Sequence, residues 1–228
     1  MTFADLQQTI GVTFKNQELL KQAFIHRSYL NEARTIHHSN ERLEFLGDAV
    51  LSFLTSNFLY ATYPDHPEGI LTNIRSALVK TTTLSEIAKT LRLGDLLFLS
   101  HGEEASGGRT NQSLLADVFE ALLGAMFLDQ GIDVCRGYLS RFLFPQAETI
   151  VASRAYIDFK SYLQEIIQQD SRQSPVYEVI KSEGPDHARK FWVEARAGDM
   201  VLGSGSGKSK QEAEQAAALT ALEKMGKL

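Results

Sequence analysis

The chain has 228 residues, of which 43% are hydrophobic and 22% charged, and its formal net charge is −5. This length suits one large domain or two smaller ones, no apolar run is long enough to cross a bilayer, and the single cysteine, Cys135, excludes an internal disulfide. We therefore expect a protein of the reducing cytoplasm, without a leader or membrane span, whose affinity for any polyanion depends on a few locally placed cations.

A helix is predicted at residues 39–50, SNERLEFLGDAV, with Ser39 as its N-cap. Because helical residues advance by about 100°, Glu41, Glu44 and Asp48 fall within one narrow stripe. The opposite, apolar face carries Leu43, Leu46, Val50, Phe53 and Leu54. The three carboxylates repel one another, so either a cation compensates them or they form a solvated face near the helix N-terminus, where the helix dipole favours negative charge.

A second helix is predicted at residues 114–128, LLADVFEALLGAMFL, a 15-residue run that is nearly all apolar except for Asp117 and Glu120. The run is too short to span a bilayer, so we expect a helix that is buried on most sides within a globular domain. Buried carboxylates need a cationic partner or a metal ion, and the run itself contains no lysine or arginine.

The two helices could approach closely, because Gly47 lies beside Asp48 and Gly124 follows Glu120 by one turn. The sequence therefore predicts that Glu44, Asp48, Asp117 and Glu120 converge on a divalent metal ion. Ligation by oxygen alone favours Mg²⁺ or Mn²⁺ over zinc. His26, His37 and His38 are weak zinc candidates, because no cysteine accompanies them at zinc-site spacing.

Four segments of this first part resemble the ribonuclease III family. They are AFIHRSYLNE (23–32), NERLEFLGDAVL (40–51), PEGILTNIRSALVK (67–80) and LLADVFEALLGAMFLD (114–129). The resemblance implies an all-α nuclease domain, placed at residues 1–152, that forms a homodimer and hydrolyses double-stranded RNA.

The resemblance also assigns site residues. Glu44, Asp48, Asp117 and Glu120 match the family's metal-binding carboxylates. Glu41 and Glu68 match further acidic positions and join Asp48 and Glu120 as predicted catalytic residues. The expected products carry 5′-phosphate and 3′-hydroxyl ends with short 3′ overhangs, and the expected substrates are rRNA precursors, mRNA and other structured RNA.

The remaining residues, 156–228, predict a small α+β domain. Residues 158–169 have the pattern of a helix, residues 175–184 and 190–205 alternate as strands with a turn at Gly198-Asp199, and residues 209–225 form an alanine-rich helix. Ser209 and Glu212 predict a capping box at the start of that helix. Of Phe191 and Trp192, we expect one in the core and the other half-exposed, although an exposed pair would suit base stacking.

The segment GSGSGKSK, residues 203–210, allows more than one interpretation. A nucleotide-binding phosphate loop is excluded, because three residues separate Gly203 from Gly207 where four are needed, so we expect no nucleotide cofactor. A flexible glycine hairpin is one alternative. We favour a site for a backbone phosphate, formed by the helix start with Lys208 and Lys210.

This second part resembles a double-stranded RNA-binding domain, through LQE at 163–165, GPDH at 184–187 and GSGKSKQEAEQAAA at 205–218. The resemblance implies an α-β-β-β-α fold. It places contacts to two successive minor grooves on the first helix and the GPDH loop, and phosphate contacts at the start of the last helix. The implied RNA-binding residues are Gln164, Glu165, Gly184, Pro185, His187, Lys208, Ser209 and Lys210. Gln211 departs from the family, which often has a lysine there.

Three functions follow as hypotheses. The first is a metal-dependent endoribonuclease specific for double-stranded RNA. The second is a catalytically idle regulator that binds double-stranded RNA, and the third is a structural helical domain with incidental acidic stripes. The loop residue Arg109 either has a structural role or approaches the substrate.

Overall fold

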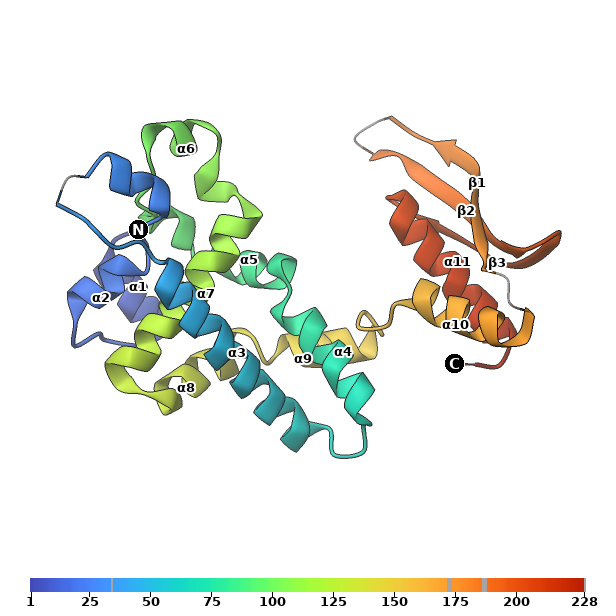
Figure 1. Ribbon diagram of the computed structural model, residues 1–228, viewed down its shortest axis with the longest axis horizontal. Helices are drawn as coiled ribbons and strands as arrows, with labels where there is room; N and C mark the ends of the chain where they lie inside the picture. The colour runs from blue at the N-terminus through green and yellow to red at the C-terminus, as the bar shows by residue number, and fades with distance from the viewer. Residues whose placement is uncertain (34, 172–173, 186–187, 228) are drawn as a thin grey trace. The chain divides into compact units, whose positions relative to one another are not determined.

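The computed structural model describes the chain except residues 34, 172, 173, 186, 187 and 228 and the side chains of residues 169–171 (Figure 1). The chain forms two compact units, Met1–Tyr156 and Ile157–Leu228, and we describe each by itself. The first is helical and the second combines a three-stranded sheet with helices, so the predicted fold class is confirmed.

The first unit is built around one deeply buried helix. Its α-helices are α1 (Phe3–Ile10), α2 (Gln17–Gln22), α3 (Glu41–Thr62), α4 (Glu68–Val79), α5 (Thr81–Thr90), α6 (His101–Ala105), α7 (Gln112–Gln130), α8 (Ile132–Phe142) and α9 (Gln146–Ala152). The 3₁₀ helices are η1 (Arg27–Asn31), η2 (Leu93–Leu96) and η3 (Gly108–Thr110). Helix α7 passes through the middle of the unit and is buried from Leu115 to Met126 except at Asp117 and Glu120 (Figure 1).

Helices α3 and α7 cross at two glycines. A Cβ atom on Gly47 would overlap the carbonyl of Glu120 and lie 3.1 Å from the nitrogen of Gly124. A Cβ atom on Gly124 would overlap the carbonyl of Leu43. The predicted close approach is therefore confirmed, and only glycine fits at either position without a shift of backbone.

Two details of the α3 prediction are wrong. The N-cap is Asn40, not Ser39, and its buried side chain donates from Nδ2 to the carbonyl of Ala23 at 3.3 Å instead of capping the helix. Ser39 donates from Oγ to the Glu41 carboxylate at 2.7 Å. Phe53 belongs to the predicted apolar face but is 60% exposed, because it lies at the edge of the face that packs on α7.

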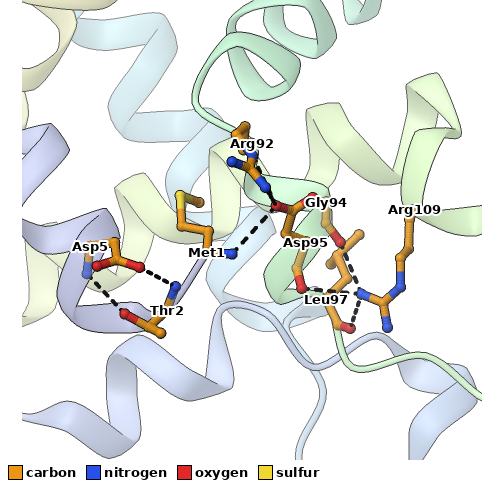
Figure 2. A network of polar contacts seen from close by, with 8 residues as sticks. All are labelled: Met1, Thr2, Asp5, Arg92, Gly94, Asp95, Leu97 and Arg109. Atoms are coloured by element: carbon orange, nitrogen blue, oxygen red, sulfur yellow. Dashed lines mark hydrogen bonds and ion pairs between the residues drawn. The ribbon is translucent and has the colours of Figure 1, made fainter.

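Arg109 has a structural role. Its guanidinium donates to the carbonyl oxygens of Gly94 at 3.0 Å and Leu97 at 2.9 Å, and its Nε donates to Glu104 at 2.7 Å. Figure 2 shows the contacts of Arg109 with the η2 segment, where Asp95 also accepts from Arg92. Arg109 therefore ties the segment before α7 to η2.

The second unit has the predicted order of elements. These are α10 (Phe159–Ser171), β1 (Val176–Glu183), β2 (Lys190–Ala197), β3 (Met200–Gly207) and α11 (Lys210–Lys224). The sheet is antiparallel in the order β1-β2-β3, with the turn at Gly198-Asp199. Val193 and Ala195 of β2 are buried with residues of α10 and α11, so both helices cover one face of the sheet. Trp192 and Phe191 are both partly exposed, and Phe191 is the one that packs against the core.

The glycine run before α11 is a strand, so the flexible-hairpin interpretation is wrong. A Cβ atom added at Gly203 would lie 2.5 Å from the carbonyl oxygen of Ala217, and one at Gly205 would overlap the Ala217 nitrogen. A Cβ atom added at Gly207 would lie 2.6 Å from the nitrogen of Ala213. These glycines face α11 because the helix packs directly on the strand backbone.

The capping box at the start of α11 is only half formed. Ser209 caps the helix as predicted, accepting from the Glu212 backbone nitrogen at 3.1 Å. The Glu212 carboxylate accepts from the Lys208 nitrogen at 2.6 Å rather than from Ser209. One backbone donor at this helix start is therefore already used within the protein.

Candidate functional site

The close crossing of α3 and α7 brings two pairs of carboxylates to one region. Glu44 and Asp48 flank Gly47 on α3, and Glu120 of α7 touches Gly47 through its backbone. Asp117 lies one turn before Glu120 on the same side of α7. Glu44, Asp117 and Glu120 are half-buried, whereas Asp48 is exposed.

Burial and mutual repulsion disfavour charge in this cluster. The pKa of Glu120 is raised to about 8, chiefly by burial and then by the charges of Asp48, Glu44 and Asp117. The pKa of Glu44 is also raised, by burial first and then by Asp117, Glu41 and Asp48. The four predicted metal ligands are thus close enough for each charge to act on its neighbours.

Among the described residues, only His26 offsets a raised pKa in the cluster, and it acts on Asp117 alone. Burial raises the pKa of Asp117, and His26 partly offsets that rise. Within the described part of the chain, the carboxyl groups of Glu44, Asp48, Asp117 and Glu120 have no ion pair and no side-chain hydrogen bond. Half-buried, unpaired oxygen donors are the chemistry that a hard divalent cation neutralises, so these residues fit a metal site.

The cluster is not a closed ligand shell. Over the described residues, no three His, Cys, Asp or Glu side chains lie close enough to hold one metal ion together. The predicted ligands therefore share a region and an electrostatic field, and joint ligation requires side-chain rotation.

The two other predicted acidic residues lie apart from this centre. Glu41 is exposed, lies 3.9 Å from Arg27 and contributes to the raised pKa of Glu44. Glu68 is exposed in the first turn of α4 and accepts from Thr72 Oγ1 at 2.9 Å. Glu68 therefore lies on α4, outside the crossing of α3 and α7 that brings the other carboxylates together.

The three histidines considered as zinc candidates differ in their burial. His37 and His38 are exposed in the segment before α3. His26 is half-buried next to η1 and acts electrostatically on Asp117. Sequence reasoning considered His26 only as a zinc ligand and missed its proximity to the acidic centre, which depends on a contact between distant segments.

The predicted RNA-binding residues of the second unit are surface groups. Exposure is common to Gln164, Glu165, Gly184, Pro185, Lys208, Ser209 and Lys210. Gly184 has a φ of +102°, a backbone conformation that glycine adopts readily. The remaining prediction, His187, lies outside the described residues.

Comparison with known proteins decides the family. Residues 16–147 match the family model described as ribonuclease-III-like, and residues 159–225 match the double-stranded RNA binding motif. A protein named Ribonuclease 3 from Geobacillus thermodenitrificans is 47% identical over 222 residues, which cover 97% of this chain and 90% of that one. The chain belongs to the ribonuclease III family.

Other ribonuclease III proteins agree with this assignment. Ribonuclease 3 of Bacillus cytotoxicus is 47% identical over 224 residues, covering 98% of this chain and 91% of its own. The solved nuclease domain of ribonuclease III from Campylobacter jejuni is 35% identical, with a TM-score of 0.59 over 63% of this chain and 99% of that domain.

The chain is therefore an endoribonuclease specific for double-stranded RNA, in a family that depends on divalent metal ions. The idle regulator and the structural helical domain are not favoured, because full-length relatives at this identity are nucleases by name. None of the described helices has the length and apolar character that a bilayer crossing needs.

Proposed function

We propose that Glu44, Asp48, Asp117 and Glu120 hold the divalent metal ions of this endoribonuclease, and that the metal is Mg²⁺, with Mn²⁺ as a substitute. One observation supports this above the others: Glu120 is half-buried and unpaired, and burial followed by the charges of Asp48, Glu44 and Asp117 raises its pKa to about 8. A bound cation would reverse that effect and favour the charged carboxylates.

Metal ions held there would activate a water molecule and stabilise charge on the phosphodiester. The protein's own part is to hold the carboxylates on two helices whose spacing is set by Gly47 and Gly124. We expect loss of the Asp48 or Glu120 carboxylate to abolish hydrolysis while sparing RNA binding. Glu41 and Glu68 remain proposed catalytic residues, and their exposure suits contact with the substrate rather than with the buried side of the cluster.

The second unit would present the RNA. We propose that Gln164 and Glu165 of α10 contact one minor groove and that Gly184, Pro185 and His187 contact the next. Lys208, Ser209 and Lys210 would hold the phosphates between these grooves. Because Glu212 already binds the Lys208 backbone nitrogen, the two lysine side chains carry most of the phosphate contact.

A homodimer is supported by an exposed apolar surface on the nuclease unit. Phe45, Phe53 and Tyr60 of α3 are 80%, 60% and 77% exposed, and Leu128 of α7 is 57% exposed. Phe45 and Leu128 also line one pocket, and clustered exposed apolar side chains are typical of protein interfaces. The Campylobacter jejuni structure is described as showing flexibility in a region involved in dimer formation. We propose that two copies associate here and that each centre cuts one strand.

The proposed products are short duplexes with 5′-phosphate and 3′-hydroxyl ends and 3′ overhangs. We propose processing of rRNA precursors, mRNA and structured RNA as the cellular role. The cytoplasmic location stays a prediction that cell fractionation would test.

A cleavage assay tests the metal centre. Wild type, Glu120→Gln and the control Glu86→Gln, which makes the same change at an exposed position of α5, are incubated with long double-stranded RNA in Mg²⁺ or EDTA. We expect short products only from wild type and the control, and only with Mg²⁺, while Glu120→Gln still shifts the RNA on a native gel. Cleavage by Glu120→Gln at the wild-type rate would contradict the assignment of this residue.

A further inference from the structure

An open polar pocket lies beside the acidic centre, between η1, α6 and the start of α7. Its volume is about 490 Å³. The lining includes His26, Arg27, Asn31, Glu103, Asn111 and Ser113. We call it the η1–α7 pocket.

The His26 ring is oriented by a chain of hydrogen bonds. The backbone nitrogen of Ser100 donates to Ser28 Oγ at 3.0 Å, and that Oγ lies 2.8 Å from His26 Nδ1. The Ser28 backbone nitrogen also donates to Nδ1, at 3.3 Å. Because Nδ1 accepts, a neutral ring carries its hydrogen on Nε2. Nε2 has no hydrogen-bond partner among the described residues, so it is available as a donor.

The amide of Asn111 is oriented in the same way. As the N-cap of α7, its Oδ1 accepts from the backbone nitrogens of Ser113 at 2.9 Å and Leu114 at 3.3 Å. The oxygen is fully used, and the Nδ2 group has no partner in the part of the chain that the structure describes. Two side chains that line one pocket therefore each keep an unpaired donor.

The pocket and the acidic centre share one face of α7. Ser113 and Leu114 precede Asp117 by four and three residues, which places them on the same side of the helix, about 6 Å away along its axis. A strand bound with one phosphodiester at the centre would pass this pocket.

The lining offers hydrogen-bond donors to an anion. Arg27 is exposed and adds a positive charge, which Glu41 at 3.9 Å shares, and Glu103 is the carboxylate of the lining. Phosphate oxygens accept from such donors, and contacts of this kind fix the register of a nucleic acid on a protein.

We propose that the η1–α7 pocket binds a backbone phosphate of the RNA strand being cut, next to the phosphodiester at the acidic centre, through His26 Nε2 and Asn111 Nδ2. The proposal rests on the metal centre proposed above. It makes His26 and Asn111 substrate-binding residues that align the strand for hydrolysis.

The test uses a short synthetic RNA duplex with one cleavage site. In separate duplexes, one phosphate within two nucleotides of the scissile bond is replaced by an uncharged methylphosphonate, or one nearby ribose by deoxyribose. Wild type is compared with Asn111→Ser, which keeps an N-cap oxygen but removes the amide, and with His26→Asn, which removes Nε2. The matched control is Asn16→Ser, because Asn16 caps α2 with the same two hydrogen bonds away from this pocket.

We expect Asn111→Ser to lower kcat/KM on the unmodified duplex by roughly tenfold to a hundredfold, as for a lost hydrogen bond to a charged group, with the melting temperature unchanged. The control should stay within about twofold. At one position of the duplex, the methylphosphonate should slow cleavage by wild type by a similar factor but should not slow Asn111→Ser any further. That position identifies the phosphate bound in the pocket. His26→Asn should show the same coupling and provides the test if Asn111→Ser fails to fold.

The proposal is overturned if the effects of variant and methylphosphonate multiply at every position, or if the variants cleave like wild type. Coupling to a deoxyribose instead of a methylphosphonate would also overturn it, because the ligand would then be a ribose hydroxyl. Failure of the metal-centre proposal would appear elsewhere, as undiminished cleavage of the unmodified duplex by Glu120→Gln.

Discussion

The acidic centre and the RNA-binding surface use charge in opposite ways. In the first unit, Glu44, Asp117 and Glu120 are half-buried, and burial followed by the charges of neighbouring carboxylates raises the pKa values of Glu44 and Glu120. In the second, Lys208 and Lys210 are exposed at a helix start and place no repulsive charge within a core. A cation that binds the acidic centre would relieve this repulsion and so stabilise the folded protein. The exposed lysines have no such effect on folding, and their attraction for RNA depends mainly on the salt concentration.

The largest effect should come from breaking the geometry of the acidic centre. In Gly47→Ala the new methyl group would overlap the Glu120 carbonyl, so α3 and α7 must move apart. We expect loss of cleavage and a decrease of about 3 kcal/mol in the free energy of unfolding, measured with urea. Gly137→Ala on α8, where a Cβ meets nothing within 4 Å, is the control and should be neutral or stabilising. A fully active Gly47→Ala would show that the helix spacing is not needed.

Separating the two units should have the next largest effect. The core of the first unit includes residues from Leu6 to Ala147, with Tyr156 packed against it, so residues 1–156 should fold and dimerise alone. Without the second unit's phosphate contacts, we expect kcat/KM on long double-stranded RNA to fall about tenfold or more at physiological salt. Circular dichroism, sedimentation and the cleavage assay check these expectations. An unfolded fragment would contradict the proposed division of the domains.

A smaller effect is the pH dependence of folding stability that Glu120 gives to the acidic centre. The pKa of Glu120 is about 8 in the folded protein, against 4.5 for a solvent-exposed glutamate side chain, so the folded state keeps a proton that the unfolded chain releases. Stability therefore falls as pH rises from about 4.5 to 8. Glu120→Gln lacks the titrating carboxyl group, so its free energy of unfolding should decrease less over this pH range than that of wild type. Allowing for partial exposure, we expect the difference to be roughly 1–2 kcal/mol.

Thermal melting at pH 5 and pH 8 measures this difference, with Glu86→Gln as the control. At pH 8, millimolar Mg²⁺ should raise the melting temperature of wild type and have less effect on Glu120→Gln. The same pH profile in wild type and Glu120→Gln would mean that burial of Glu120 carries no electrostatic penalty.

The smallest effect concerns the RNA-binding surface. Gln211→Lys restores a cation that related domains often have beside Lys210, at an exposed position of α11. We expect tighter binding of double-stranded RNA and a salt dependence steeper by about one unit in log–log slope, without a change in melting temperature. Filter binding from low to high salt measures this slope. An unchanged slope would place residue 211 outside the phosphate contacts.

The sequence predicted those features that depend on local periodicity. The helical stripes and the order of elements in the second unit follow from spacing along one chain segment. The close approach of α3 and α7 was predicted because Gly47 and Gly124 stand beside the acidic residues of the two helices. The buried character of α7 follows from its composition.

Contacts between distant segments that no glycine or charge pattern marks in the sequence were missed. The N-cap of α3 shifts to Asn40 because its amide finds the Ala23 carbonyl, which lies 17 residues away. Arg109 is structural because three carbonyl groups of η2 and its flank lie within its reach. The polar pocket near His26 needs η1 and α7 together, so no motif in either segment indicates it.

The three glycines of β3 have a consequence for mutational tolerance. Because Gly203, Gly205 and Gly207 lie against α11, replacement of any of them requires the helix to move, whereas Ser204 is exposed and Ser206 is partly exposed. A saturation scan across residues 203–210 should therefore separate two constraints, which are packing against α11 and contact with RNA. Gly203, Gly205 and Gly207 would be intolerant because of packing even when no RNA is present. Lys208 and Lys210 would respond to selection for RNA cleavage, and Ser209, which caps α11 and is a proposed phosphate contact, would respond to both.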